Sequence, residues 1–344
     1  MENKYYFNII FFLFSIFSYF FIYINRIKIA KYLNIMDYPN SKRKIHSTPV
    51  PKTASFSLFF SFILILITNL NFKIYTSDLN IILIGTIFIF LIGFLDDKYN
   101  ILPHYKIIFT GLIIFLTANL SNNLIIEKIY FQTFDTFLHL NLFSFFFTCL
   151  AILLLINAAN LSDGINGLTI GIIFFWLFYF FIQKSGSDLN FFIFLVLINL
   201  LIAFIHCYFG KHFLGDSGSL MLATFVSFFF IFETNISIKN ELLPFSAEHL
   251  FILFWLPGVE MLRLFIERIL RNKSPFNADK EHLHHYLIKK YSLKKSLFIY
   301  FIILNIPIIL TWYLKFNFIF ILFIIVVFYF LFINYLRNYY KNDK

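Results

Sequence analysis

Eleven apolar runs, each close to the length of a membrane-spanning helix, constrain most strongly what this chain can fold into. A helix needs about 20 apolar residues to cross a bilayer, and lipid tolerates only helices and closed barrels. Of the 344 residues, 60% are hydrophobic and 13% charged, whereas soluble domains average about 45–50% and about 25%. The sequence therefore predicts an all-α polytopic membrane protein. The runs cover approximately residues 6–24, 54–72, 80–95, 106–121, 142–159, 168–182, 189–207, 219–236, 248–267, 296–313 and 317–335.

We expect these spans to form a single integral membrane domain over residues 1–344. The first run has a long apolar core and no small-residue cleavage pattern, so it is expected to be a retained span rather than a signal peptide. Segment 122–141 is too polar to span. The alternating Ile125, Ile129 and Phe131 predict a short hairpin there, on the periplasmic surface.

The basic residues predict the orientation of the chain. Net charge is +10, and 22 of the 28 Lys and Arg residues fall on one side of the predicted spans. By the positive-inside rule that side is cytoplasmic, with the N-terminus outside and the C-terminus cytoplasmic. Because orientation explains the charge, we expect contact with membrane lipids and not with nucleic acid. The functional cytoplasmic loops are predicted at about 27–53, 96–106, 157–167, 206–219 and 268–295.

Five polar clusters fall in these loops, while the spans themselves carry almost no charge. A transporter would place ionisable residues near the middle of the membrane, along a path. The pattern favours an active site at the boundary between membrane and cytosol. A secondary transporter or flippase of an anionic solute is the alternative.

Two adjacent carboxylates, Asp96 and Asp97, end the third predicted span. They repel each other unless a cation neutralises them, and Lys98, Lys106 or a magnesium ion could do so. The alternative is a solvated helix end. A loop rich in Asn, Asp and Gly follows the fifth span, where glycine lets the backbone approach a ligand closely. An ordinary polar turn is the alternative there. The side chains of interest are Asn157, Asn160, Asp163 and Asn166.

Asp216, Ser217 and Ser219 open the eighth predicted span. A serine there could simply cap the helix. The free amides of a helix N-terminus also bind phosphate, and Asp216 would fit there if it shared a metal with that phosphate. The combination favours metal-bridged phosphate binding.

His282, His284 and His285 lie in the most basic loop, after Arg268. We interpret them as a cradle for pyrophosphate, with a zinc site as the alternative. In a helix, His282 and His285 would share a face and His284 would point elsewhere. The first loop has a basic run with Lys44 and His46, which would attract a lipid phosphate or serve only as a topological anchor.

The clusters together resemble the polyprenyl-phosphate N-acetylhexosamine-1-phosphate transferases (MraY/WecA-type, glycosyltransferase family 4), from about Asp37 to Tyr286. The form of the histidine motif is closer to the WecA-like branch than to the peptidoglycan branch. The motifs that carry the resemblance are DYPNSKRKIHSTPVP, GFLDD, NAANLSDGINGL, FLGDSGS and SPFNADKEHLHH.

The resemblance implies an eleven-span enzyme in the bacterial inner (plasma) membrane, with its active site at the cytoplasmic face. It implies transfer of HexNAc-1-phosphate from a UDP-N-acetylhexosamine to undecaprenyl phosphate, with release of UMP. The product would initiate a cell-envelope glycan of the O-antigen, enterobacterial common antigen or teichoic-acid type. The sequence leaves open whether the protein forms a homodimer.

The resemblance also implies roles for individual residues. Asp96, Asp97 and Asp163 would be catalytic, and Asp216 with Asp163 would hold Mg²⁺, or alternatively Mn²⁺. Substrate contacts would come from Lys44, His46, Lys106, Asn157, Asn160, Asn166, His206, Ser217, Arg268, His282, His284 and His285.

Four positions depart from the family pattern. Thr53-Ala54-Ser55 stands where a Gly pair is usual, and His206 stands where Asn is common. Asn166 and Glu260 each replace a common Asp.

Overall fold

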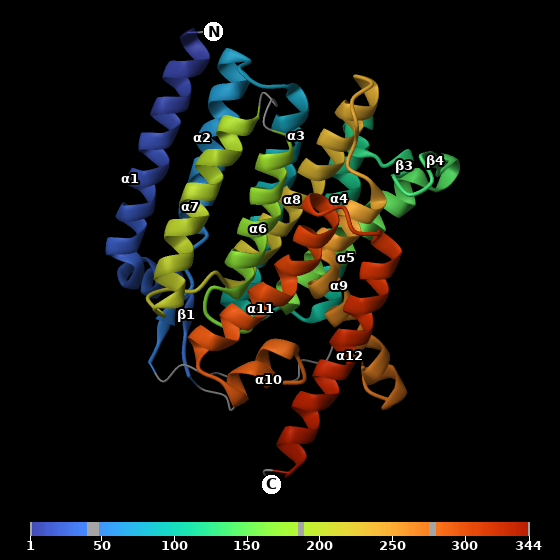
Figure 1. The fold of residues 1–344 in the computed structure, drawn as a ribbon. Helices are drawn as coiled ribbons and strands as arrows, with labels where there is room; N and C mark the ends of the chain where they lie inside the picture. The colour runs from blue at the N-terminus through green and yellow to red at the C-terminus, as the bar shows by residue number, and fades with distance from the viewer. Residues whose placement is uncertain (1, 40–47, 185–188, 275–279, 343–344) are drawn as a thin grey trace. The chain divides into compact units, whose positions relative to one another are not determined.

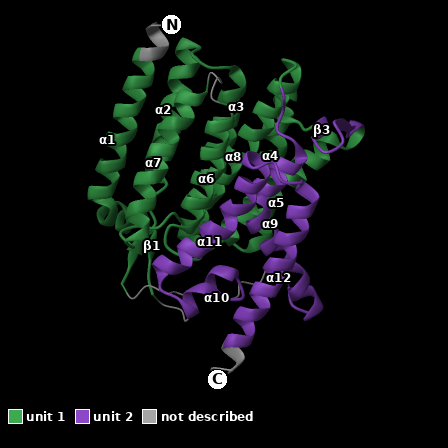
Figure 2. Cartoon of the chain, viewed as in Figure 1, with its two compact units in different colours: residues 1–126, 142–242 green, residues 127–141, 243–344 purple. Residues whose placement is uncertain are grey.

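A computed structural model of the chain describes residues 2–39, 48–184, 189–274 and 280–342 (Figure 1). These residues fold into two compact units (Figure 2). The first unit comprises residues 1–126 and 142–242, and the second comprises residues 127–141 and 243–344.

The first unit is built mainly from eight α-helices and one small ribbon among the residues that the structure describes. The helices are α1 (Glu2–Leu33), α2 (Phe56–Phe72), α3 (Ser77–Tyr99), α4 (Pro103–Asn119), α5 (Ser144–Leu161), α6 (Leu168–Gln183), α7 (Asn190–Tyr208) and α8 (Gly215–Lys239). Strand β1 (Met36–Asp37) pairs antiparallel with β2 (Val50–Pro51), which fixes the two ends of the first loop.

Helix α8 forms the core of the first unit. Every residue from Ser217 to Phe230 is buried. This agrees with the sequence of the helix, which is apolar around its whole circumference rather than on one face. Helix α8 packs most extensively on α3 and also contacts α5, while α1 lies beside α2 and α7 (Figure 1). Aromatic rings fill much of this core, for example Phe180 against Phe229 with ring centroids 4.6 Å apart.

The second unit combines a hairpin with four helices, α9 (Ala247–Leu270), α10 (Leu283–Lys290), α11 (Leu293–Ile308) and α12 (Phe318–Asn342). A π-helical turn, Ile309–Tyr313, follows α11. In the hairpin, β3 (Lys128–Phe131) pairs with β4 (Thr136–His139). The Glu248 carboxylate at the start of α9 accepts hydrogen bonds from the amides of Gln132 and Thr133 at the hairpin turn.

The predicted all-α polytopic fold is confirmed. Each of the eleven predicted spans overlaps a helix, and the polar segment 122–141 contains the predicted hairpin. Within the described part of the chain, eight helices are long and apolar enough to cross a membrane, and α2 and α6 are apolar but shorter. The sidedness of the termini and of the hairpin, and the single catalytic domain, stay predictions.

Candidate active site

The N-terminus of α8 is capped by a side chain from another helix. Both carboxylate oxygens of Asp97, in the last turn of α3, accept backbone hydrogen bonds from α8, one from Asp216 at 3.0 Å and one from Ser217 at 3.0 Å. The first amides of a helix have no partner within the helix, so a carboxylate there is favoured by hydrogen bonding and by the helix dipole. Neither Ser217 nor Ser219 caps this helix, and the amides of Asp216 and Ser217 are occupied by Asp97.

Two glycines allow this close approach of α3 and α8. A Cβ on Gly215, whose φ is +71°, would lie 2.6 Å from one oxygen of Asp97. A Cβ on Gly93 would lie 2.5 Å from both the carbonyl oxygen of Asp216 and the Cα of Ser217. Any larger residue at either position would therefore push the carboxylate away from the amides that it binds.

Lys52 provides the counter-charge for Asp97. Its Nζ lies 3.0 Å from an Asp97 carboxylate oxygen. Burial acts to lower the pKa of Lys52, but the charge of Asp97 outweighs burial and raises this pKa above its usual range, so Lys52 stays cationic. The backbone around Lys52 is fixed because Phe213 donates to the Pro51 carbonyl at 2.8 Å and Ala54 donates to the Phe213 carbonyl at 3.1 Å.

Lys106 joins the other two carboxylates. Its Nζ lies 2.7 Å from Asp96 and 2.7 Å from Asp216. The second oxygen of Asp96 accepts the amide of Ile101 at 2.7 Å, which fixes the turn between α3 and α4. The side chain of Asp216 is 30% exposed, whereas those of Asp96 and Asp97 are 8% and 1% exposed. Asp216 is therefore the most accessible of the three to a ligand.

Asp163, in the loop between α5 and α6, belongs to the same electrostatic cluster. Burial and the nearby negative charges of Asp216 and Asp97 raise the pKa of Asp163 to about 7, with Lys52 acting in the opposite direction. We refer to Asp96, Asp97, Asp163 and Asp216 as the acidic cluster. Together with Lys52 and Lys106, the cluster carries a formal charge of −2 when all six side chains are ionised.

Two serines of α8 contact neighbouring elements, Ser219 the end of α5 and Ser217 the start of α2. The Ser219 hydroxyl donates to the side-chain oxygen of Asn160 at 2.6 Å. The Ser217 hydroxyl, fully buried, lies 3.2 Å from that of Ser55. Ser217 is thus engaged through both its amide and its hydroxyl.

The remaining predicted residues of the first unit occupy varied positions. Asn157 donates to the Leu153 carbonyl within α5 at 2.7 Å. The Asn166 amide group lies beside Gly210, which has a φ of +65°. His206 bonds Tyr19 through Nδ1 at 2.9 Å, and its ring lies 4.0 Å from that of Tyr23, so it belongs to an aromatic group at the end of α7.

The histidine motif lies in the second unit. His282 is the N-cap of α10 with an extended backbone, and the rings of His282 and His284 stack with centroids 5.1 Å apart. The expectation that His284 would point away from the other two is wrong, because His282 precedes the helix and so does not follow its periodicity. The His284 and His285 rings are 4.3 Å apart. Arg268 is buried in the last turn of α9.

Sequence reasoning missed Lys52 and Ser55 as members of the site. The available signal for Lys52 was a basic residue directly before an apolar run in a chain whose acidic residues gather at helix ends. Lys44 and His46 lie outside the described residues.

The geometry can bind a polyanion together with a cation. Magnesium takes one or two carboxylates and completes its shell with water and phosphate oxygens. The formal charge of −2 in the acidic cluster and the accessible carboxylate of Asp216 fit such an ion. Among the residues that the structure describes, no three His, Cys, Asp or Glu side chains are grouped to hold a metal by themselves. The donor set therefore fits a metal shared with a ligand.

Comparison with known proteins agrees with this geometry. Residues 79–233 match the model of the family described as glycosyl transferase family 4, and this range contains the whole acidic cluster. Over these residues the chain is similar to glycosyl transferase family 4.

Named relatives align with this chain over most of its length. An undecaprenyl-phosphate alpha-N-acetylglucosaminyl 1-phosphate transferase of Thermotoga maritima is 28% identical over 78% of the chain and 78% of the relative. Proteins of the same name from Yersinia pestis and Escherichia coli O157:H7 are 26% and 24% identical, over 80% and 76% of the chain and 74% and 71% of the relatives.

Proposed function

We propose that this chain transfers N-acetylhexosamine-1-phosphate from a UDP-N-acetylhexosamine to undecaprenyl phosphate and releases UMP. The observation that carries the proposal is the grouping of three aspartates at the start of α8. Lys106 joins Asp96 to Asp216, and Asp97 accepts the Asp216 amide, all within the part of the chain that matches the family. An oxygen of the lipid phosphate attacks the β-phosphorus of the nucleotide sugar. The bond from that phosphorus to the bridging oxygen breaks, and this oxygen leaves on UMP.

The chemistry of the cluster supports this assignment. Both reacting groups are anionic, so the barrier is largely electrostatic and the protein must offset their repulsion. Lys106 presents a cation between Asp96 and Asp216, where a substrate phosphate could replace one carboxylate as its partner. Asp216 and Asp163 would hold Mg²⁺, which would neutralise charge on the pyrophosphate. Mn²⁺ is the alternative ion.

The two adjacent aspartates have different roles in this proposal. Asp97 has both oxygens engaged by Asp216, Ser217 and Lys52, so it positions the Asp216 backbone. Asp96 shares Lys106 with Asp216 and is the member of the pair that can exchange that contact with a lipid phosphate. Asn160 holds the loop of Asp163 to α8 through Ser219.

The location of the reaction follows from its substrates. Undecaprenyl phosphate arrives from the bilayer and the nucleotide sugar from the cytosol, so we infer an inner-membrane enzyme whose site faces the cytoplasm. The contact of the histidine motif, Arg268, Lys44, His46, Asn157, Asn166 and His206 with substrate stays a prediction, as does a homodimer.

The test is release of UMP by purified protein supplied with undecaprenyl phosphate and each of several UDP-N-acetylhexosamines, with and without Mg²⁺. We expect Asp216→Asn to lower turnover by at least about 10²-fold. The matched control is Asp78→Asn, at the other end of α3, where the carboxylate binds Ser121 and Asn123. Equal turnover of the wild type and Asp216→Asn would contradict the assignment. Solute uptake by proteoliposomes without lipid phosphate would instead favour a transporter.

A further inference from the structure

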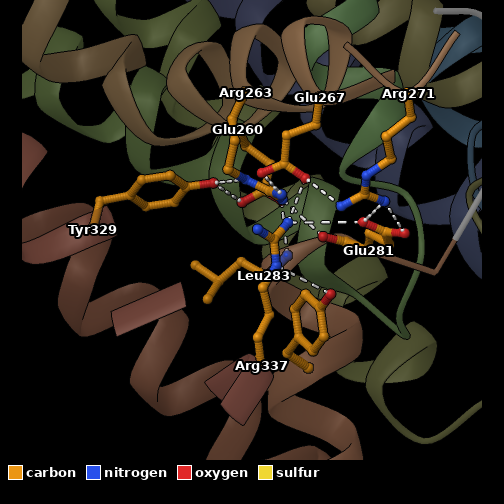
Figure 3. Close-up of polar contacts among 9 residues, drawn as sticks. Glu260, Arg263, Glu267, Arg271, Glu281, Leu283, Tyr329 and Arg337 are labelled. Atoms are coloured by element: carbon orange, nitrogen blue, oxygen red, sulfur yellow. Dashed lines mark hydrogen bonds and ion pairs between the residues drawn. The ribbon is translucent and has the colours of Figure 1, made fainter. Parts of the chain in front are cut away.

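The short segment that carries His282 is attached to α9 on both sides of this residue (Figure 3). On one side, the Arg263 guanidinium donates to the Glu281 carbonyl at 2.7 Å. On the other, the Leu283 amide donates to the Glu260 carboxylate at 2.8 Å. Two side chains of one helix therefore fix the backbone immediately before and after His282.

These two side chains form a buried ion pair. Arg263 and Glu260 are 3% and 4% exposed, and they lie 2.7 Å apart one helical turn from each other. A buried ion pair is stabilised only if the remaining donors and acceptors also find partners. Charged groups inside a predicted membrane span are rare and commonly functional. Here, part of the hydrogen bonding of the pair is supplied by the backbone of the histidine segment.

Helix α12 completes the pair through one hydroxyl. The Tyr329 hydroxyl donates to the second oxygen of Glu260 at 2.8 Å and accepts from Nε of Arg263 at 2.8 Å. Tyr329 is 1% exposed. One oxygen atom on α12 thus orients both members of the pair, as Figure 3 shows.

A more exposed layer of ion pairs surrounds this core. Glu267 pairs with Arg263 at 3.1 Å and with Arg337 of α12, and Arg271 pairs with Glu281 at 2.6 Å (Figure 3). Exposed ion pairs contribute little free energy individually. The buried residues Glu260, Arg263 and Tyr329 therefore carry most of the attachment.

The segment held in this way carries a histidine with an open ring nitrogen. His284 is 2% exposed, and within the described residues its Nε2 has no hydrogen-bond partner. A buried polar atom without a partner is unfavourable unless a ligand supplies one. A fixed orientation of the His284 ring would direct Nε2 toward a ligand that binds beside it.

We propose that Glu260 and Arg263, completed by Tyr329, are positioning residues that set the orientation of the histidine motif. They act through the backbone at Glu281 and Leu283 and do not touch the reacting groups. The effect of this positioning on turnover rests on the proposed transferase function, whereas its effect on the structure of the segment does not.

The structural test is hydrogen–deuterium exchange of a peptide covering residues 280–290 in detergent. Tyr329→Phe removes one hydroxyl and keeps the ring. Because a buried hydrogen bond contributes on the order of 1 kcal/mol, we expect the Leu283 amide to exchange about 5-fold faster. Tyr335→Phe is the matched control, since the Tyr335 hydroxyl on α12 contacts Lys290 at the other end of α10. Glu260→Gln, which keeps an acceptor for Leu283, should have a smaller effect than Glu260→Ala.

The functional test is a double-mutant cycle on turnover. If Tyr329 acts through the histidines, Tyr329→Phe should lower the wild-type kcat while changing that of His284→Ala by less than about 2-fold. Additive losses, or unchanged exchange of residues 280–290 in both Tyr329→Phe and Glu260→Ala, would overturn the proposal. If the wild type releases no UMP with any donor, the proposed function fails, and the exchange measurement still decides the positioning role.

Discussion

The Asp216 amide donates a hydrogen bond of 3.0 Å to the carboxylate of Asp97, so one acidic residue of the site fixes the backbone of another. The bond joins the end of α3 to the start of α8. Both carboxylate oxygens of Asp97 are therefore bonded within the protein. The side chain of Asp216 is more exposed and can contact a ligand.

Replacing Asp97 with Asn should disrupt both the position of Asp216 and the stability of the protein. An amide group would replace one acceptor oxygen with a donor that faces a backbone amide, and Lys52 would lose its counter-charge. We expect turnover to fall at least about 10²-fold, and the loss of charged hydrogen bonds to lower the free energy of unfolding by about 1.5–3 kcal/mol. Turnover and thermal unfolding would be compared with Asp78→Asn. Unchanged values for Asp97→Asn would show that the cap is dispensable.

Replacing Lys106 with Met should leave Asp96 and Asp216 unneutralised beside each other. We expect turnover to fall at least about 10²-fold, because a cation for the transferring phosphate is also lost. Lys98→Met is the control, since Lys98 lies near Asp97 in the chain but over the ring of Tyr99. The assay is UMP release at saturating magnesium. Equal losses of turnover in Lys106→Met and Lys98→Met would contradict a specific role for the ion pairs of Lys106 with Asp96 and Asp216.

Replacing Gly215 with Ala should separate α8 from Asp97. The left-handed φ alone disfavours a side chain by about 1–2 kcal/mol, and the new Cβ would also lie 2.6 Å from a carboxylate oxygen. We expect a lower unfolding temperature and lower turnover. Gly111→Ala on α4 is the control, because nothing lies within 4 Å of its Cβ position. Equal unfolding temperature and turnover in Gly215→Ala and Gly111→Ala would show that the close approach of Gly215 to Asp97 is unimportant.

The loop between α7 and α8 should make stability depend on pH. Burial, then the charges of His206 and Arg26, lower the pKa of His212 from 6.5 to about 3. The unfolded chain binds this proton more readily, so the free energy of unfolding should fall as pH drops below 6.5, by roughly 1–2 kcal/mol at pH 5. Tyr19 and Tyr23 also face the ring.

Unfolding of His212→Gln at pH 7.5 and pH 5 measures this contribution. The variant should lose less stability between these pH values than the wild type does, and less than a variant of the exposed His104. An equal pH dependence in His212→Gln and the wild type would contradict the prediction.

The elements of this fold could be predicted because their signals are local. Runs of apolar residues set the helices, and the alternation around Ile129 set the hairpin. The cap of α8 could not be predicted, because Asp97 and the amide of Ser217 are 120 residues apart and no local pattern connects them. The sequence instead predicted a metal-bridged phosphate at this helix start, with capping by Ser217 or Ser219 as the alternative.

The candidate site was predictable in its residue types and less so in its contacts. Acidic residues at helix ends identified Asp96, Asp97 and Asp216, and their interaction is observed directly or through Lys106. The stacking of His282 on His284 was not predictable from helical periodicity, because it depends on where α10 begins. Glu260 was noted only as a departure from the family pattern, although it binds Leu283.

The contact at Gly93 limits how the enzyme can move. With the backbone of α8 so close to this glycine and with Asp97 bonded to its first turn, neither helix can slide or rotate against the other without breaking these bonds. Helices α3 and α8 are therefore expected to move together, so an opening that admits a long-chain lipid has to occur away from the contact between these two helices.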